Sequence, residues 1–217
     1  NLIKKWLTPF KQENDQTVSE DLAVIWIHGA NQSGLSFQYL RSLTRFKNEL
    51  VVEYDTSNKF FNNLEMLSKK INQFTGPYFI IGHSLGGLYA LHLTKHVDIV
   101  GAVSISTPFA GSWTADWARF FVPTYQLFRE VGRRSIPIKE SQDINLKVDW
   151  TQIVSTKGNV PYHGGQNDGV CTIKSMKSRK DMELIEVPHT HFEVMCSDLV
   201  AEIILDRYQK ICTEQTK

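Results

Sequence analysis

Short apolar runs alternate with helix-like segments along most of this chain. The runs are continuous and rich in β-branched residues, which is typical of strands covered on both faces. Between and after them, apolar residues recur three or four positions apart, which predicts helices at residues 36–46, 62–74, 85–96 and 192–211. The predicted strands lie at residues 22–27, 50–54, 78–81, 99–105, 151–155 and 183–187. This order predicts a single-domain α/β fold: a mostly parallel sheet of about six strands, flanked by helices and joined by right-handed crossovers.

One connection is too long for this regular alternation of strands and helices. The segment between residues 105 and 151 exceeds an ordinary loop with a single helix, so we expect a lid-like insertion around residues 109–145. Two interpretations of its aromatic side chains stay open: they belong to a helix that packs on the core, or to a lid that presents an apolar wall to a substrate. These aromatic residues are Trp113, Trp117, Phe120, Phe121 and Phe128.

Length and charge narrow the class of protein. The 217 residues, 41% of them hydrophobic, suit a single domain over residues 1–217. Because 24 basic residues balance 23 acidic ones, for a net charge of +1, we expect no nucleic-acid partner. No apolar run approaches the roughly 18 residues of a membrane span, so we expect no integral membrane segment, although transient contact with a lipid surface stays open. We expect a soluble protein, either cytoplasmic or exported after removal of an N-terminal leader, and the oligomeric state is left open.

The most informative motif is GHSLG, which follows the predicted strand at residues 78–81. It matches G-x-S-x-G, with Ser84 between Gly82 and Gly86. Glycines at these places let the strand and helix backbones approach closely, so the turn can hold the serine hydroxyl exposed in a strained conformation. Ligands bind at the carboxyl ends of parallel strands, which is where this turn lies. The motif therefore predicts a nucleophile elbow with Ser84 as the catalytic nucleophile.

A serine hydroxyl needs a base, and the base needs an orienting acid. In elbow-bearing folds both come later in the chain, in the order serine, acid, histidine, on loops after later strands. Asp168, in a glycine-rich loop after the predicted strand at 151–155, is the candidate acid, although Asn-Asp-Gly is also strong turn chemistry. For the base, His191 is favoured because it opens the predicted closing helix, and His189 is the alternative.

The tetrahedral intermediate of acyl transfer also needs backbone donors for its oxyanion. The N–H of Leu85, directly after Ser84 at a helix N-terminus, is one candidate. The second is expected in the loop HGANQSG after the first strand, from Ala30 or, as the alternative, from Asn31. His28, at the start of the same loop, is interpreted as a buried residue that braces it.

Five segments, taken in order, resemble one known family. IWIHGANQSG, GHSLGG, SISTPFAGS, NDGV and HFEV are similar to the lipase and esterase branch of the α/β-hydrolase superfamily, particularly its small bacterial lipase-like members. The resemblance covers roughly residues 22–207. It implies a minimal sheet of about six strands, an acyl-enzyme on Ser84, a His191 base held by Asp168, and hydrolysis of a carboxylic ester without metal or cofactor. A small-molecule acyl ester is the implied substrate.

Other functions stay open beside this one. A thioesterase or phospholipase would use the same machinery, and the motifs do not separate them from an esterase. A non-catalytic protein of the same fold would bind a small molecule or a partner through the same pocket, but it would not need all three triad residues. The sequence contains no nucleotide-binding glycine motif and no H-E-x-x-H, and its three scattered cysteines predict neither a disulfide framework nor a zinc site. We therefore expect no metal and no cofactor.

Overall fold

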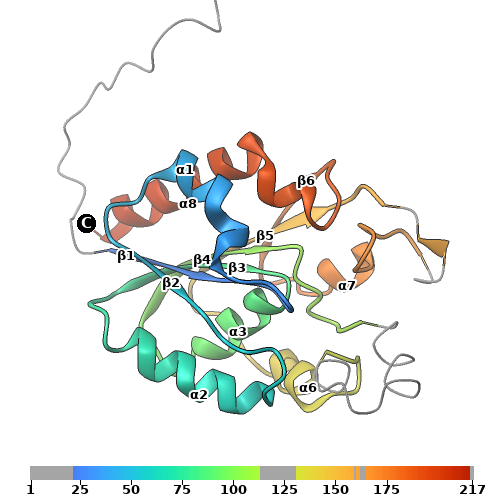
Figure 1. The fold of residues 1–217 in the computed structure, drawn as a ribbon, viewed down its shortest axis with the longest axis horizontal. Coiled ribbons are helices and arrows are strands. Elements are labelled where there is room, and N and C mark those ends of the chain that lie inside the picture. The colour runs from blue at the N-terminus through green and yellow to red at the C-terminus, as the bar shows by residue number, and fades with distance from the viewer. Residues whose placement is uncertain (1–21, 113–130, 159, 162–164, 216–217) are drawn as a thin grey trace, which may run out of the picture.

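The computed structural model describes residues 22–112, 131–158, 160–161 and 165–215. Its centre is a six-stranded sheet in the order β2-β1-β3-β4-β5-β6 (Figure 1). Every pair of neighbouring strands in this sheet is parallel, so the sheet predicted from the sequence is confirmed. The strands are β1 (Ala23–Ile27), β2 (Glu49–Val52), β3 (Tyr78–His83), β4 (Ile99–Ile105), β5 (Asp149–Ser155) and β6 (Glu183–Val187).

Helices cover both faces of the sheet. In Figure 1, α1 and α8 lie on one side of it, and α2, α3 and α6 lie on the other. Two short 3₁₀ helices, η2 and η4, precede α1 and α8. The elements are η2 (Gly34–Phe37), α1 (Gln38–Thr44), α2 (Phe60–Ile71), α3 (Leu85–Leu93), α6 (Ile136–Gln142), α7 (Ile173–Met176), η4 (Glu193–Cys196) and α8 (Asp198–Gln215). None of the helices in the described ranges combines the length and the apolar character needed to cross a membrane.

The two faces of the sheet carry two hydrophobic cores. On β1, Ala23, Ile25 and Ile27 belong to the core that includes α2 and α3, whereas Val24 and Trp26 belong to the core that includes α1 and α8. Successive side chains of a strand point to opposite faces, and all five residues of β1 are fully buried. Burial on both faces is the reason that the strands stand out in the sequence as continuous apolar runs.

Some predicted boundaries are wrong. β3 continues to His83, so the strand runs directly into the elbow, and α3 ends before its predicted end. The predicted closing helix at residues 192–211 is wrong at its start, because Ser197 separates η4 from α8. Ser197 has an extended backbone, and its Oγ accepts a hydrogen bond from the N–H of Val200 at 3.4 Å, as a capping residue does. His191 therefore lies in a loop before η4, outside the closing helix.

The central part of the predicted insertion, with all five aromatic residues named for it above, lies outside the described residues, so the lid stays a prediction. The described ends of the insertion pack on the rest of the fold. Phe109 is fully buried, with its ring centroid 6.4 Å from that of Trp150. The helix α6, which the sequence did not predict, is held against α3 by a hydrogen bond of 2.9 Å from His92 Nε2 to the carbonyl oxygen of Pro137.

The sheet brings the elbow to its centre. β1 lies between β2 and β3, so the chain runs from β1 to β2 in one direction across the sheet and from β2 to β3 in the opposite direction. Ligands of open α/β sheets bind at the carboxyl ends of the strands at such a switch point. α3 begins directly after β3 and approaches β1 so closely that a Cβ on Gly86 would lie 2.0 Å from the carbonyl oxygen of Ile27. A Cβ on Gly82 would lie 2.6 Å from the backbone of Gly86. Both glycines of the motif are therefore required by backbone contact.

We expect Gly86→Ala to lower the free energy of unfolding by about 3 kcal/mol, because the new methyl group meets a backbone oxygen that cannot move without displacing β1. Gly101→Ala is the matched control. Its Cβ would meet only side-chain atoms, the nearest being Ile211 Cγ1 at 2.7 Å, so we expect a loss of about 1 kcal/mol. Urea denaturation measures both values, and equal losses in the two variants would contradict the close approach of α3 to β1.

Candidate active site

Ser84 lies at the junction of β3 and α3. Its backbone angles, φ 52° and ψ −116°, fall outside the helical and strand regions, a conformation that costs about 1–3 kcal/mol in an L-residue. The residue is the N-cap of α3, yet its side chain makes no capping hydrogen bond. Its N–H donates to the carbonyl oxygen of Ile105 on β4 at 2.8 Å, which ties the turn to the sheet. Ser84 is half-buried between the buried His83 and Leu85.

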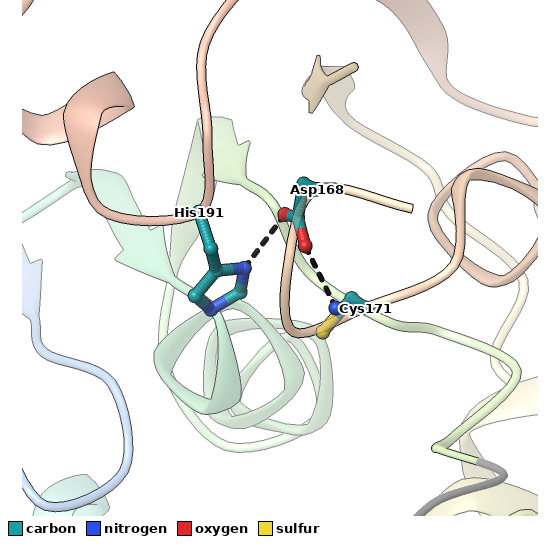
Figure 2. Close-up of side chains that lie close together, drawn as sticks. All are labelled: Asp168, Cys171 and His191. Atoms are coloured by element: carbon teal, nitrogen blue, oxygen red, sulfur yellow. Dashed lines mark hydrogen bonds and ion pairs between the residues drawn. The ribbon is translucent and has the colours of Figure 1, made fainter. Parts of the chain in front are cut away.

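Asp168 and His191 form a buried hydrogen-bonded pair (Figure 2). His191 Nδ1 lies 2.7 Å from Asp168 Oδ2, and both side chains are almost fully buried. A carboxylate can only accept, so the hydrogen lies on Nδ1 and the neutral ring has its lone pair at Nε2. This is the tautomer that a general base needs.

Asp168 is held by several donors. Among the described residues, Oδ1 accepts from the N–H of Val170 at 3.0 Å and of Cys171 at 2.7 Å, and Oδ2 accepts from Ser155 Oγ at 2.5 Å as well as from His191. Burial by itself raises the pKa of Asp168. The hydrogen bond and charge of His191, with the bonds from Ser155 and Cys171, outweigh burial and lower the pKa overall, so the carboxyl group stays ionised. The turn chemistry noted in the sequence coexists with the pairing, because one oxygen closes the turn and the other faces His191.

The segment that carries His191 is fixed by its own backbone. The N–H of His191 donates to the carbonyl oxygen of Asp168 at 3.0 Å. Thr190 and Glu193 form a capping box around it, in which the N–H of Thr190 donates to Glu193 Oε2 at 3.0 Å and the N–H of Glu193 donates to Thr190 Oγ1 at 3.3 Å. The backbone that carries the imidazole is thus held at His191 itself and by the capping box around it.

The alternative histidine, His189, has a different partner. Its Nε2 lies 2.8 Å from Ser197 Oγ, and its carbonyl oxygen accepts from the N–H of Lys157 at 3.0 Å. The first bond joins the segment after β6 to the residue before α8, and the second joins it to the segment after β5. Of the two histidines, it is His191 that the structure pairs with Asp168.

The loop after β1 is braced by His28, as the sequence predicts. His28 is fully buried, its Nδ1 lies 2.8 Å from the carbonyl oxygen of Gly29, and its ring stacks on Tyr54 with centroids 4.3 Å apart. Farther along the loop, the N–H of Asn31 donates to Thr56 Oγ1 at 3.0 Å. Because this donor is already used, Ala30 is the better candidate of the two for binding an oxyanion.

His83, which the sequence analysis did not single out, joins three parts of the site. Its Nε2 donates to the carbonyl oxygen of His191 at 3.0 Å, and its Nδ1 lies 3.1 Å from Gln32 Oε1. The same Gln32 oxygen accepts from the N–H of Gly29 at 3.2 Å. The rings of His83 and His191 are 4.9 Å apart. Because His83 directly precedes Ser84, these contacts bring His191 to the elbow. The motif offered a signal, since His83 fills its variable position, but the motif assigns that position no role.

Cys171 is a second residue that sequence analysis missed. One ligand atom from each of Asp168, Cys171 and His191 lies within 4.8 Å of the others, a spacing that a metal ion could use (Figure 2). The carboxylate oxygens, however, already accept hydrogens, including the one on His191 Nδ1. Burial raises the pKa of the Cys171 thiol, with the charge of Asp168 as the second cause, so the thiol is protonated. The geometry therefore fits a hydrogen-bonded pair with a neighbouring thiol better than a metal centre.

Comparison with solved structures places this arrangement among known folds. The mature form of the lipase BlEst2 from Bacillus licheniformis matches with a TM-score of 0.73 at 15% identity, over 92% of this chain and 95% of that chain. This chain has an α/β-hydrolase fold. The phospholipase PlaB from Legionella pneumophila, in complex with thio-NAD, matches with a TM-score of 0.67 at 13% identity, over 89% of this chain and 61% of that chain. A lipase-esterase related protein from Clostridium acetobutylicum matches with a TM-score of 0.57 at 12% identity, over 89% and 96% of the two chains.

No family model matches the sequence, and no curated protein matches it significantly. The assignment to the α/β-hydrolase fold thus rests on three-dimensional arrangement. Within that fold, Ser84, Asp168 and His191 follow β3, β5 and β6, and the carboxyl ends of these parallel strands share one edge of the sheet.

The buried histidines of this fold predict a loss of stability in mild acid. Burial is the main cause that lowers the pKa of His83 to about 3 and that of His92 to about 4. Between the ordinary pKa of 6.5 and these values, the unfolded chain binds protons that the folded chain does not. The free energy of unfolding therefore falls as the pH falls from about 6.5 to 4, by up to about 1.4 kcal/mol per pH unit for each histidine.

Urea denaturation across this pH range measures the slope. His83→Gln keeps an N–H donor for the carbonyl oxygen of His191, and His92→Gln keeps one for Pro137, so each variant should retain its contact while the slope drops by about one proton. A slope that is the same in both variants as in the unmodified protein would contradict neutral, buried histidines at these positions.

Proposed function

We propose that this chain is a serine hydrolase that cleaves carboxylic esters of small acyl substrates through an acyl-enzyme on Ser84. One observation carries the proposal: the hydrogen bond between Asp168 and His191, whose ring lies against His83, the residue before Ser84. An imidazole oriented by a carboxylate can activate a serine hydroxyl, which is a weak nucleophile, and here it packs against the residue that directly precedes a strained, uncapped serine.

In the proposed mechanism, His191 Nε2 takes the proton of the Ser84 hydroxyl as the oxygen attacks the ester carbonyl. Asp168 stabilises the imidazolium that forms and does not take the proton itself. His191 then gives the proton to the leaving alcohol as the carbon–oxygen bond of the ester breaks. A water molecule, deprotonated by the same nitrogen, then attacks the acyl carbon. As the bond between that carbon and Ser84 Oγ breaks, His191 returns the proton to Oγ and the carboxylic acid leaves. These steps use only groups of this chain and water.

The oxyanion is proposed to bind two backbone donors. The N–H of Leu85 lies in the first turn of α3, where helix N–H groups lack partners within the helix and the helix dipole favours negative charge. The N–H of Ala30 lies in the loop after β1, which approaches α3 at Gly86. Removal of one such donor costs about a hundredfold or more in related chemistry.

The comparisons support the broader class, a hydrolase of the lipase and esterase type. The similar structures named above are described as a lipase, a lipase-esterase related protein and a phospholipase. Fold likeness at such low identity does not select the substrate. The triad chemistry supports acyl transfer, and the carboxylic ester is proposed from the resemblance of the sequence motifs to lipases and esterases.

Ser84→Ala is expected to lower ester hydrolysis by at least about a thousandfold, because the nucleophile is lost. A series of p-nitrophenyl esters from acetate to palmitate measures turnover. A fluorophosphonate probe, located by mass mapping, should label Ser84 in the unmodified protein and nothing in the variant. Ser42→Ala, on the exposed side of α1, is the matched control and should keep both activity and label.

Turnover by Ser84→Ala within about tenfold of the unmodified protein would remove Ser84 as nucleophile. Faster hydrolysis of acyl thioesters or phospholipids than of simple esters would favour a thioesterase or a phospholipase. No label and no turnover at any chain length, with or without detergent, would favour a non-catalytic binding protein of this fold.

The two histidines give a second test. His191→Gln should lower kcat by at least about a thousandfold, since the base is lost, whereas His189→Gln should stay within about tenfold of the unmodified protein. The reverse pattern, measured with the preferred ester of the series, would make His189 the base and contradict the pairing with Asp168.

A further inference from the structure

A chain of buried hydroxyl groups reaches Asp168 from the sheet. Ser155, the last residue of β5, has its Oγ 2.5 Å from Asp168 Oδ2, and Ser106, directly after β4, has its Oγ 2.7 Å from that of Ser155. Both serines are fully buried. We propose that Ser155, supported by Ser106, is a positioning residue that holds the carboxylate of Asp168 toward His191. This inference rests on the hydrolase function proposed above.

The hydroxyl hydrogens of Ser106 and Ser155 can point in only one direction, toward Asp168. The ionised carboxylate accepts and cannot donate, so Ser155 must give its hydrogen to Asp168 Oδ2. With its single hydrogen used, the oxygen of Ser155 can only accept from Ser106, whose hydroxyl therefore donates. A hydrogen bond to a charged acceptor is stronger than a neutral one, and a donor that itself accepts a hydrogen bond is polarised further. The geometry thus makes Ser106 a support for the bond that Ser155 makes.

Ser106 has an unusual backbone conformation. Its φ of 53° lies in the left-handed region that residues with a side chain rarely adopt, and its N–H donates to the carbonyl oxygen of Ile153 on β5 at 2.8 Å. A buried residue stays in such a conformation only where the surrounding structure compensates, and such residues cluster at functional sites. β4 and β5 are interior strands of the sheet, so both hydroxyls lie at the ends of strands that are paired on both sides.

Ser155 and His191 bind the same oxygen of Asp168, so Ser155 can influence the proposed base. Oδ1 of Asp168 is taken up by the backbone turn, so the charge at Oδ2 is divided between the hydrogens of Ser155 and His191. Without the Ser155 hydroxyl, Oδ2 keeps only the hydrogen of His191 while Oδ1 stays in the backbone turn. The carboxylate is then held less firmly on the Oδ2 side, and more of its charge faces the imidazole, which favours protonated His191. The rate should therefore fall, and the loss of activity in acid should begin at a higher pH. The other titratable groups near the pair, His83 from β3 and Cys171 from the turn after β5, are present in every variant below.

Ser155→Ala and Ser104→Ala form the matched pair for the test. Ser104 is also fully buried, on β4, but its hydroxyl bonds to Gln152 and Trp150 and has no contact with the chain that reaches Asp168. We expect Ser155→Ala to lower kcat by about tenfold to a hundredfold with little change in KM, as for loss of one charged hydrogen bond. Its acid limb in the pH profile of kcat/KM should move to higher pH. Ser104→Ala should lose stability without a change in the pH profile.

Ser106→Ala keeps the test decisive if Ser155→Ala does not fold. It leaves the Ser155 hydroxyl in place but removes its support, so we expect the same direction of both effects, with a loss in kcat of about threefold. Proton NMR gives a readout that does not depend on turnover. The Nδ1 proton of His191 should give a resolved downfield signal in the unmodified protein, and this signal should shift in Ser155→Ala and not in Ser104→Ala.

The two proposals fail in different ways. If the unmodified protein shows neither turnover nor label at Ser84, the hydrolase function fails, while the NMR signal still tests the contact between Ser155 and the Asp168–His191 pair. If the protein hydrolyses esters but Ser155→Ala and Ser106→Ala keep its kcat, its acid limb and its Nδ1 signal, the positioning role of Ser155 is wrong. Equal effects in Ser104→Ala would likewise overturn it, because they would show a general response to a lost buried hydroxyl.

Discussion

The site depends on one close contact, between the first turn of α3 and the end of β1. Without a side chain at Gly86, the helix backbone reaches the carbonyl oxygen of Ile27, and the sharp turn that results holds Ser84 in a conformation that L-residues avoid. Compensation for this strain comes from the burial of β3, whose side chains enter both cores, and of α3, which packs in one of them. A rigid set of parallel strands thereby fixes the serine before any substrate binds.

Near the elbow, two buried titratable groups differ in charge: Asp168 is ionised and His83 is neutral. Asp168 stays charged in the interior because donors surround it, whereas His83 stays neutral because burial opposes its protonation more than its hydrogen bond favours it. Negative charge is therefore placed at the carboxylate of Asp168, and the neutral His83 adds no positive charge near it. Such confinement of charge in a water-poor site is the basis of electrostatic preorganisation.

Much of this could be predicted from the sequence, for identifiable reasons. Strands buried on both faces appear as continuous apolar runs, and the elbow is a local motif whose glycines are required by backbone contact. The helix α6 was missed because it is short and depends on capping by Ser135 and docking onto His92 more than on apolar periodicity. Ser155 and Cys171 were missed because their relation to Asp168 arises from folding. His191 was favoured over His189 because it opens the predicted closing helix, but the structure places it in a loop before η4. What distinguishes the two histidines is their tertiary partners, which the sequence does not show.

The position of β6 at the edge of the sheet bears on which part of the molecule unfolds first. β6 is an edge strand, most of its residues are exposed, and the loop that carries His191 follows it. Ser84, by contrast, directly follows β3, which is a fully buried interior strand of the sheet. Local opening is easiest where few buried contacts hold a segment, so the margin of the sheet opens before its centre. Under mild heating, the proposed base and the proposed nucleophile would then separate while most strands remain paired, and the proposed activity would be lost before the fold.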